Sequence, residues 1–275
     1  MEKKRDWINV LSCLLGGFVL LCFSGIISQP LEKIMPPYGY LFRFLVYAAL
    51  TIASVKYLTK QAGITLEQCR ITKVRLHPLG ILFAICLPVV MVLWTIHGEP
   101  GHFVYNQMST EQAMEILFYL MFHTGFCSGI VEEMMFRGAL TRICEEKVGR
   151  RLAWIMPTFL FVLPHLRNIS SPLDFWSTCL FMTAISIFFT VLTYRTGTVW
   201  DAALVHAFWD MFAARSNVVA VSSEMESGAF FTYVLDCPEL HPLQNVRGNE
   251  SLWMVSAVFL VCSGLLAVSN LRKKR

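Results

Sequence analysis

The chain has 275 residues, of which 55% are hydrophobic and only 15% are charged, and its mean hydropathy is +0.55. A soluble domain of this length carries many more polar residues, so the composition indicates a polytopic membrane protein. The net charge of +4 is modest and is distributed between apolar runs, which does not indicate a nucleic-acid partner.

Eight apolar runs come close to the ~20 residues that a helix needs to cross a bilayer. We therefore expect an all-α transmembrane bundle of about eight helices, forming a single integral membrane domain over residues 1–275. The fifth and seventh runs are short. The first is too long for a cleavable signal peptide and lacks a small-residue cleavage pattern. The runs are Ile8–Ile27, Tyr38–Val55, Leu79–Ile96, Ala113–Phe136, Leu152–Leu166, Phe175–Tyr194, Val199–Phe212 and Leu252–Val268.

Loops rich in lysine and arginine alternate with loops that contain few of them. These residues are frequent before the first run and after the second, fourth and eighth, and sparse in the other loops. The positive-inside rule then predicts a multi-pass protein of the cell membrane with both termini in the cytoplasm and a long external loop over residues 216–251. The basic positions are Lys3, Lys4, Arg5, Lys56, Lys60, Arg70, Lys73, Arg75, Arg142, Lys147, Arg150, Arg151 and residues 272–275.

The fourth run contains three ionisable residues, Glu132, Glu133 and Arg137. Ionisable side chains at membrane depth are costly and by default indicate a functional site. On an α-helix Glu133 and Arg137 are four residues apart and can pair, which leaves Glu132 to face a cavity. The alternative is that both glutamates are interfacial charges near the cytoplasmic end of the helix.

The fifth and seventh apolar runs also contain ionisable residues. We therefore expect a motif-bearing core at about residues 113–215. His165 ends the fifth run, one helical turn after Phe161, which can pack beside the imidazole. His206 and Asp210 are four residues apart and therefore share a face of the seventh helix. Each of these signals is weak alone, because a lone histidine near a helix end is usually an ordinary interfacial residue.

Together the residues resemble a known family. Glu132-Glu133-x-x-x-Arg137, Phe161-x-x-x-His165 and His206-x-x-x-Asp210 resemble the three motifs of the CPBP family of intramembrane proteases, also called the Abi or type II CAAX prenyl endopeptidase family. The resemblance covers about residues 128–210. It implies an eight-helix architecture and a glutamate-dependent endopeptidase that uses neither a metal ion nor another cofactor.

The resemblance also implies roles for the residues. Glu132 corresponds to the catalytic glutamate that activates water together with His165, while His206 and the residue four positions later hold the oxyanion. Glu133, Arg137 and Phe161 are supporting residues. The chain departs from the family at Asp210, where many members carry asparagine. Because an ionised carboxylate only accepts hydrogen bonds, Asp210 must be protonated or must instead orient His206.

Two other kinds of catalytic site compete with this interpretation. A zinc protease would use His165, His206 and a glutamate, but the HExxH motif is absent. His123 lies nine residues before Glu132, which on an α-helix places it on the opposite side, so we expect it to be a buried packing residue. A serine or cysteine nucleophile has no supporting motif.

Non-enzymatic functions also stay open, because the same polar residues suit a proton-coupled transporter or a membrane scaffold. A transporter more often shows inverted halves and broken helices at matching positions. For an endopeptidase, the resemblance implies a membrane-associated protein or peptide as substrate, either a CAAX-type protein or a peptide precursor. The expected surroundings are the lipid bilayer, with no nucleic acid.

Overall fold

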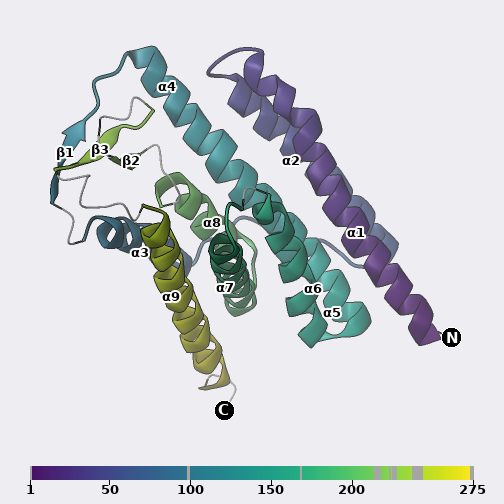
Figure 1. Ribbon diagram of the computed structural model, residues 1–275. Coiled ribbons are helices and arrows are strands. Elements are labelled where there is room, and N and C mark those ends of the chain that lie inside the picture. Colours follow the sequence, from purple (N-terminus) through teal and green to yellow (C-terminus); the bar gives the residue numbers. More distant parts are fainter. Residues whose placement is uncertain are drawn as a thin grey trace.

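The computed structural model describes residues 2–97, 100–167, 169–213, 218–222, 224, 228–236 and 244–272. These residues form a helical bundle with a small sheet at one end (Figure 1). All eight expected apolar runs are helical, so the predicted fold class is confirmed. The helical elements are α1 (Glu2–Ser28), η1 (Gln29–Lys33), α2 (Gly39–Ala62), α3 (Pro78–Ile96), α4 (Thr110–Phe118), η2 (Tyr119–Glu132), η3 (Met134–Leu140), α5 (Thr141–Val148), α6 (Arg150–Val162), η4 (Leu163–Leu166), α7 (Pro172–Thr196), α8 (Trp200–Phe212) and α9 (Gln244–Arg272).

Six helices in the described part of the chain are long and apolar enough to cross a membrane. They are α1, α2, α3, the continuous helix from α4 to α5, α7 and α9. The protein is therefore a multi-pass membrane protein. The helices α6 and α8 have 13 residues each, or about 20 Å, and are shorter than the ~30 Å hydrocarbon core.

The helix from Thr110 to Val148 is widened in its middle. It begins with a capping box in which Ser109 and Gln112 exchange hydrogen bonds. The segments η2 and η3 then have π-helical hydrogen bonding, from each residue to the fifth one before it. A turn here takes more than four residues, so side chains on this helix do not follow the α-helical spacing that the sequence suggests.

The helix α8 lies in the interior of the bundle, where it packs against η2, α3 and α7. Its approach to η2 depends on glycine. A Cβ added at Gly129 would lie 2.6 Å from the Ala203 carbonyl oxygen and 2.7 Å from the Ala207 Cβ, and one at Gly125 would meet Met211. Small residues spaced by four allow membrane helices to pack this closely. The contact brings the helix that carries Glu132 against the helix that carries His206.

The first turn of α8 is fixed to α3 by a buried carboxylate. Asp201 accepts hydrogen bonds from the backbone N–H of His77 at 2.8 Å and from its Nδ1 at 2.7 Å. Gly80 lies directly against this carboxylate, because a Cβ there would approach the Asp201 Oδ1 to 2.2 Å. Asp201, which precedes the third motif in the sequence, is thus a structural residue. It orients α8, the helix that carries His206 and Asp210.

The sheet was not predicted. Strand β1 (Gly101–Tyr105) pairs antiparallel with β3 (Phe231–Leu235), and β2 (Val219–Ser222) pairs parallel with β3. In Figure 1 it lies near the start of α4, away from the N-terminal end of α1 and the C-terminal end of α9. The expected loop at 216–251 therefore contains two strands. It is also shorter than expected, because α9 begins at Gln244 and not at Leu252.

Candidate active site

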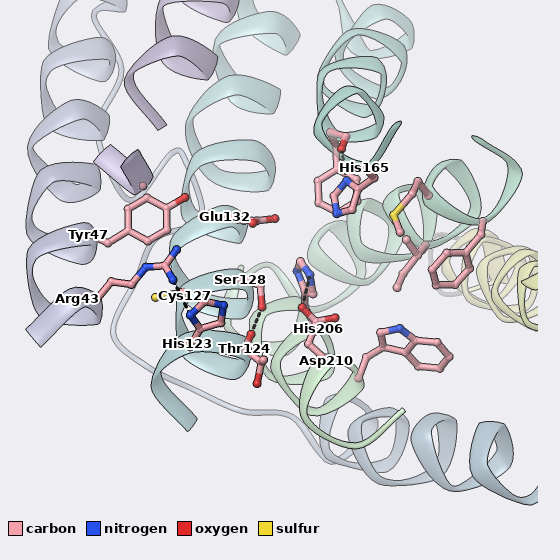
Figure 2. A pocket seen from close by; sticks show the side chains of 16 residues that line it. Arg43, Tyr47, His123, Thr124, Cys127, Ser128, Glu132, His165, His206 and Asp210 are labelled. Atoms are coloured by element: carbon pink, nitrogen blue, oxygen red, sulfur yellow. Dashed lines mark hydrogen bonds and ion pairs between the residues drawn. The ribbon is translucent and has the colours of Figure 1, made fainter. Parts of the chain in front are cut away.

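A cavity of about 450 Å³ lies between the helices that carry the three motifs. Figure 2 shows Glu132, His165 and His206 reaching it from three separate helical segments. About half of the lining residues are apolar or aromatic, and the other half carry polar or charged groups. The lining residues are Gly25, Arg43, Tyr47, His123, Thr124, Cys127, Ser128, Glu132, Phe161, His165, Phe181, Met182, Ile185, His206, Trp209 and Asp210.

The two adjacent glutamates have different surroundings. Glu132 lines the cavity and is partly accessible, whereas Glu133 is fully buried. The Oε1 of Glu133 accepts a hydrogen bond from Arg137 Nη1 at 2.7 Å, so the expected pair is present. The alternative of two solvated interfacial charges does not fit, because both members of this pair are at most 2% exposed.

His165 lies in η4, at the end of the short helix α6, where its side chain is exposed. Its Nδ1 is 2.9 Å from the carbonyl oxygen of Phe161. Because a carbonyl only accepts, Nδ1 carries the hydrogen and donates it. In the neutral imidazole this leaves Nε2 unprotonated and able to take a proton from a water molecule in the cavity.

His206 lies between two carboxylates. Its Nδ1 is 2.9 Å from the Oε1 of Glu133, and its Nε2 is 3.6 Å from the Oδ2 of Asp210. The first contact was not foreseen, because the sequence pairs Glu133 only with Arg137. Glu133 therefore fixes the ring of His206 as well as the guanidinium. The 3.6 Å separation from Asp210 is an ion-pair distance and too long for a direct hydrogen bond.

Phe161 packs against the two histidines of the motifs, His165 and His206. Its ring centroid is 5.1 Å from that of His165 and 5.9 Å from that of His206, and the Arg137 guanidinium lies 4.3 Å above its face. Phe189 stacks on the ring of His206, with the two centroids 4.8 Å apart. These aromatic contacts restrict the two imidazoles, and Phe189 is a supporting residue that the motifs do not contain.

The expected position of His123 was wrong. His123 lines the same cavity as Glu132 and is not on the opposite side of the helix. The π-helical segment explains the difference, because nine residues at more than four per turn make about two full turns. Both side chains therefore return to one face.

Sequence reasoning also missed Arg43, which reaches the cavity from α2. Arg43 lies inside the second apolar run, so the rule that drew attention to Glu132 would have identified it too. Among the residues that the structure describes, no group of three or more His, Cys, Asp and Glu side chains is placed to hold a metal ion.

Comparison with known proteins agrees with the motifs. The model of the family described as Type II CAAX prenyl endopeptidase Rce1-like matches residues 114–212, the segment from α4 to the end of α8. No curated protein matches the chain. The described helices are those of a multi-pass membrane protein, and over residues 114–212 the chain is similar to this family of CAAX-type proteases. The resemblance to the CPBP family is confirmed by this match, which contains all seven motif residues.

Proposed function

We propose that the protein is an endopeptidase that hydrolyses peptide bonds within the membrane by means of a water molecule activated by Glu132 and His165. The observation that carries this proposal is the convergence of Glu132, His165 and His206 on one cavity from three helical segments. The cavity is large enough for a short stretch of extended peptide together with a water molecule.

The proposed chemistry follows from which side-chain atoms can accept a proton. The Glu132 carboxylate and the Nε2 of His165 are acceptors, so one of them takes a proton as the water oxygen attacks the scissile carbonyl carbon. The carbonyl oxygen then becomes an oxyanion. When the tetrahedral intermediate collapses, the C–N bond breaks and the departing nitrogen receives the proton that was taken from the water.

The proposed oxyanion donor is His206. Its Nδ1–H is directed at Glu133, so only Nε2 is left to face the substrate, and it donates when the ring is an imidazolium. Asp210 and Glu133 provide negative charge on both sides of this ring. We therefore assign Asp210 to the orientation of His206, and Glu133, Arg137 and Phe161 to support of the same ring.

The proposed substrate is a membrane-associated CAAX-type protein or peptide precursor. It can be identified by comparing the new peptide termini in membranes of cells that express the wild-type protein or Glu132→Gln. We expect a small set of termini that depends on the carboxylate and is preserved in Glu111→Gln, a control at an exposed position of the same helix. Identical sets of termini in wild type and Glu132→Gln would favour a scaffold or a transporter instead.

A further inference from the structure

Tyr47 is a polar residue of the cavity wall that none of the proposed steps of hydrolysis uses. It lies on the membrane-spanning helix α2, belongs to the hydrophobic core and is only 8% exposed, yet it lines the cavity that contains Glu132. Figure 2 shows its hydroxyl oxygen directed toward the helix that carries Glu132. A buried tyrosine usually finds a hydrogen-bond partner, because an unpaired hydroxyl in apolar surroundings is costly.

The protein itself supplies no partner for this hydroxyl. The Tyr47 hydroxyl makes no hydrogen bond to any residue that the structure describes, and its oxygen is accessible and not enclosed by other atoms. Gly25 of α1 leaves the space beside it open, since a Cβ added there would lie 3.9 Å from the hydroxyl oxygen. The hydroxyl can therefore be reached by a molecule that occupies the cavity.

The other hydroxyl groups of the described lining residues are already engaged. Thr124 donates to the carbonyl oxygen of Leu120 at 2.6 Å, and Ser128 donates to the carbonyl oxygen of Thr124. In both cases the acceptor lies four residues earlier on the same helix. Within the described part of the wall, Tyr47 thus carries the hydroxyl hydrogen that is left for a ligand.

A peptide in the cavity brings backbone groups that need such a donor. An extended peptide has lost the hydrogen bonds of a helix, and at membrane depth little water is present to replace them. A carbonyl group that stays unpaired there weakens binding. A phenol is a neutral donor and matches a neutral acceptor, and the backbone carbonyl is the neutral acceptor that every peptide carries.

The size of the cavity limits which carbonyl group can reach Tyr47. A sphere of about 450 Å³ is about 10 Å across, and an extended peptide advances about 3.3–3.6 Å per residue, so the cavity holds about three residues. Tyr47 and Glu132 line this space from two different helices. The carbonyl group at Tyr47 therefore flanks the scissile bond, whose own oxygen is assigned to His206.

We propose that Tyr47 binds the substrate, and that its hydroxyl donates a hydrogen bond to a backbone carbonyl group flanking the scissile bond. This inference rests on the proposed endopeptidase function. Because this carbonyl group does not react, the hydrogen bond is equally strong in the bound substrate and in the transition state. It fixes the register of the peptide relative to Glu132, and it acts on KM and not on kcat.

The first test removes the hydroxyl oxygen alone. Tyr47→Phe keeps the ring, and the purified full-length variant in liposomes is assayed with short synthetic peptides. We expect KM to rise about 5- to 100-fold, the range for an acceptor that loses its donor, with kcat unchanged. The melting temperature should not fall, because the hydroxyl has no partner among the described residues. Tyr57→Phe, at a 59% exposed position of the same helix, is the matched control and should keep the wild-type KM.

The second test changes the peptide and leaves the protein intact. One backbone carbonyl oxygen at a time is replaced by sulfur, which is a weaker acceptor. With the wild-type protein, the replacement at one position flanking the scissile bond should raise KM. With Tyr47→Phe, the replacement at that position should have no further effect, while replacements at other positions should act as they do on the wild type.

Binding measured without turnover separates this inference from the proposed function. Fluorescence anisotropy of the same peptides, labelled with a fluorophore, should show weaker binding to Tyr47→Phe with Glu132→Gln than to Glu132→Gln alone, even if the wild type hydrolyses no peptide. Equal binding would overturn the role of Tyr47. So would a fall in kcat with KM unchanged, or equal sensitivity of the wild type and Tyr47→Phe to every sulfur replacement. Absence of peptide binding by the wild type would contradict this inference and the proposed function together.

Discussion

At the scale of single residues, the site depends on a carboxylate that does not face the substrate. Glu133 accepts hydrogen bonds from Arg137 and from His206 through one oxygen, and it is fully buried. The motif identifies Glu133 by its position beside Glu132, but its contact with His206 spans 73 residues of sequence and is visible only in the fold. A buried charge with two partners affects both stability and chemistry.

We expect Glu133→Gln to lower turnover per folded molecule by about 10- to 100-fold, because the neutral amide leaves no charge opposite the imidazolium of His206. The variant also leaves Arg137 buried without its counter-charge, so its folded yield should fall. The double variant Glu133→Gln with Arg137→Gln should recover yield but not turnover. Recovery of both would show that Glu133 acts only through Arg137. Turnover is measured per molecule of folded, purified protein.

Substitutions at Asp210 test the role of the one motif residue that differs from the family, where many members carry asparagine. The carboxylate of Asp210 is 3.6 Å from Nε2 of His206 and 29% exposed. We expect Asp210→Asn to keep most of the turnover, because an amide can both orient the imidazole and donate to the oxyanion. Asp210→Ala should lose up to about 10²–10³-fold, the cost of losing an oxyanion donor, because His206 is then no longer oriented toward the oxyanion. Equal turnover of the wild type and Asp210→Ala, in initial-rate assays, would remove Asp210 from the site.

At the scale of elements, hydropathy predicted all eight helices because each apolar run stands alone in the sequence. It did not predict the sheet, since β1 and β3 are five residues long and are separated by the 125 residues from 106 to 230. The assumption of α-helical spacing placed His123 on the wrong side, because the π-helical widening of η2 depends on packing and not on a local sequence pattern. The motif residues were recoverable, and the rule for ionisable residues in apolar runs would also have found Arg43, but its place in the cavity wall follows only from the packing of α2 against η2.

The contact between η2 and α8 can be tested at Gly129. In Gly129→Ala the new Cβ would overlap the backbone of Ala203 and the side chain of Ala207, which should destabilise the fold by about 1–3 kcal/mol. The variant should also lose turnover, since the two helices carry Glu132 and His206. Gly16→Ala is the matched control, because a Cβ there meets nothing within 4 Å. Thermal unfolding in detergent measures both, and equal melting temperatures would contradict the close contact.

At the scale of the whole molecule, the site lies toward one end of the bundle. His165 is followed within two residues by the end of its helical segment, and Asp210 is two residues before the end of α8. The basic residue Arg150 begins α6, and Arg70 lies at the start of α8, where its carbonyl oxygen accepts a hydrogen bond from the Val199 N–H. Both are therefore at the other ends of the segments that carry His165 and Asp210. If the positive-inside rule holds, both termini are cytoplasmic and the proposed site opens toward the external side.

Two of the native cysteines cannot report this orientation. Cys69 and Cys144 are fully buried, and burial raises the pKa of the Cys69 thiol to about 11, so both stay unmodified on either side. Cys237, a natural choice in the expected external loop, lies outside the described residues. Single cysteines at the exposed positions Lys73 and Gln107, in a cysteine-free background, are suitable replacements.

We expect a membrane-impermeant maleimide to label Gln107→Cys in intact cells and to label Lys73→Cys only after the membrane is opened. Both sites should react after solubilisation, which controls for accessibility. The reverse pattern would place the termini outside the cell and the proposed site toward the cytoplasm.

The central claim is that Glu132 is the base that activates the water. The direct measurement is the hydrolysis rate of one identified substrate by purified wild type and Glu132→Gln, each with a strong chelator present and each shown to be folded and free of other proteases. We predict that the chelator leaves the wild-type rate unchanged and that Glu132→Gln is slower by about 10²–10⁴-fold, the range for general-base catalysis. A wild-type rate in Glu132→Gln, or activity that the chelator removes and zinc restores, would contradict the account.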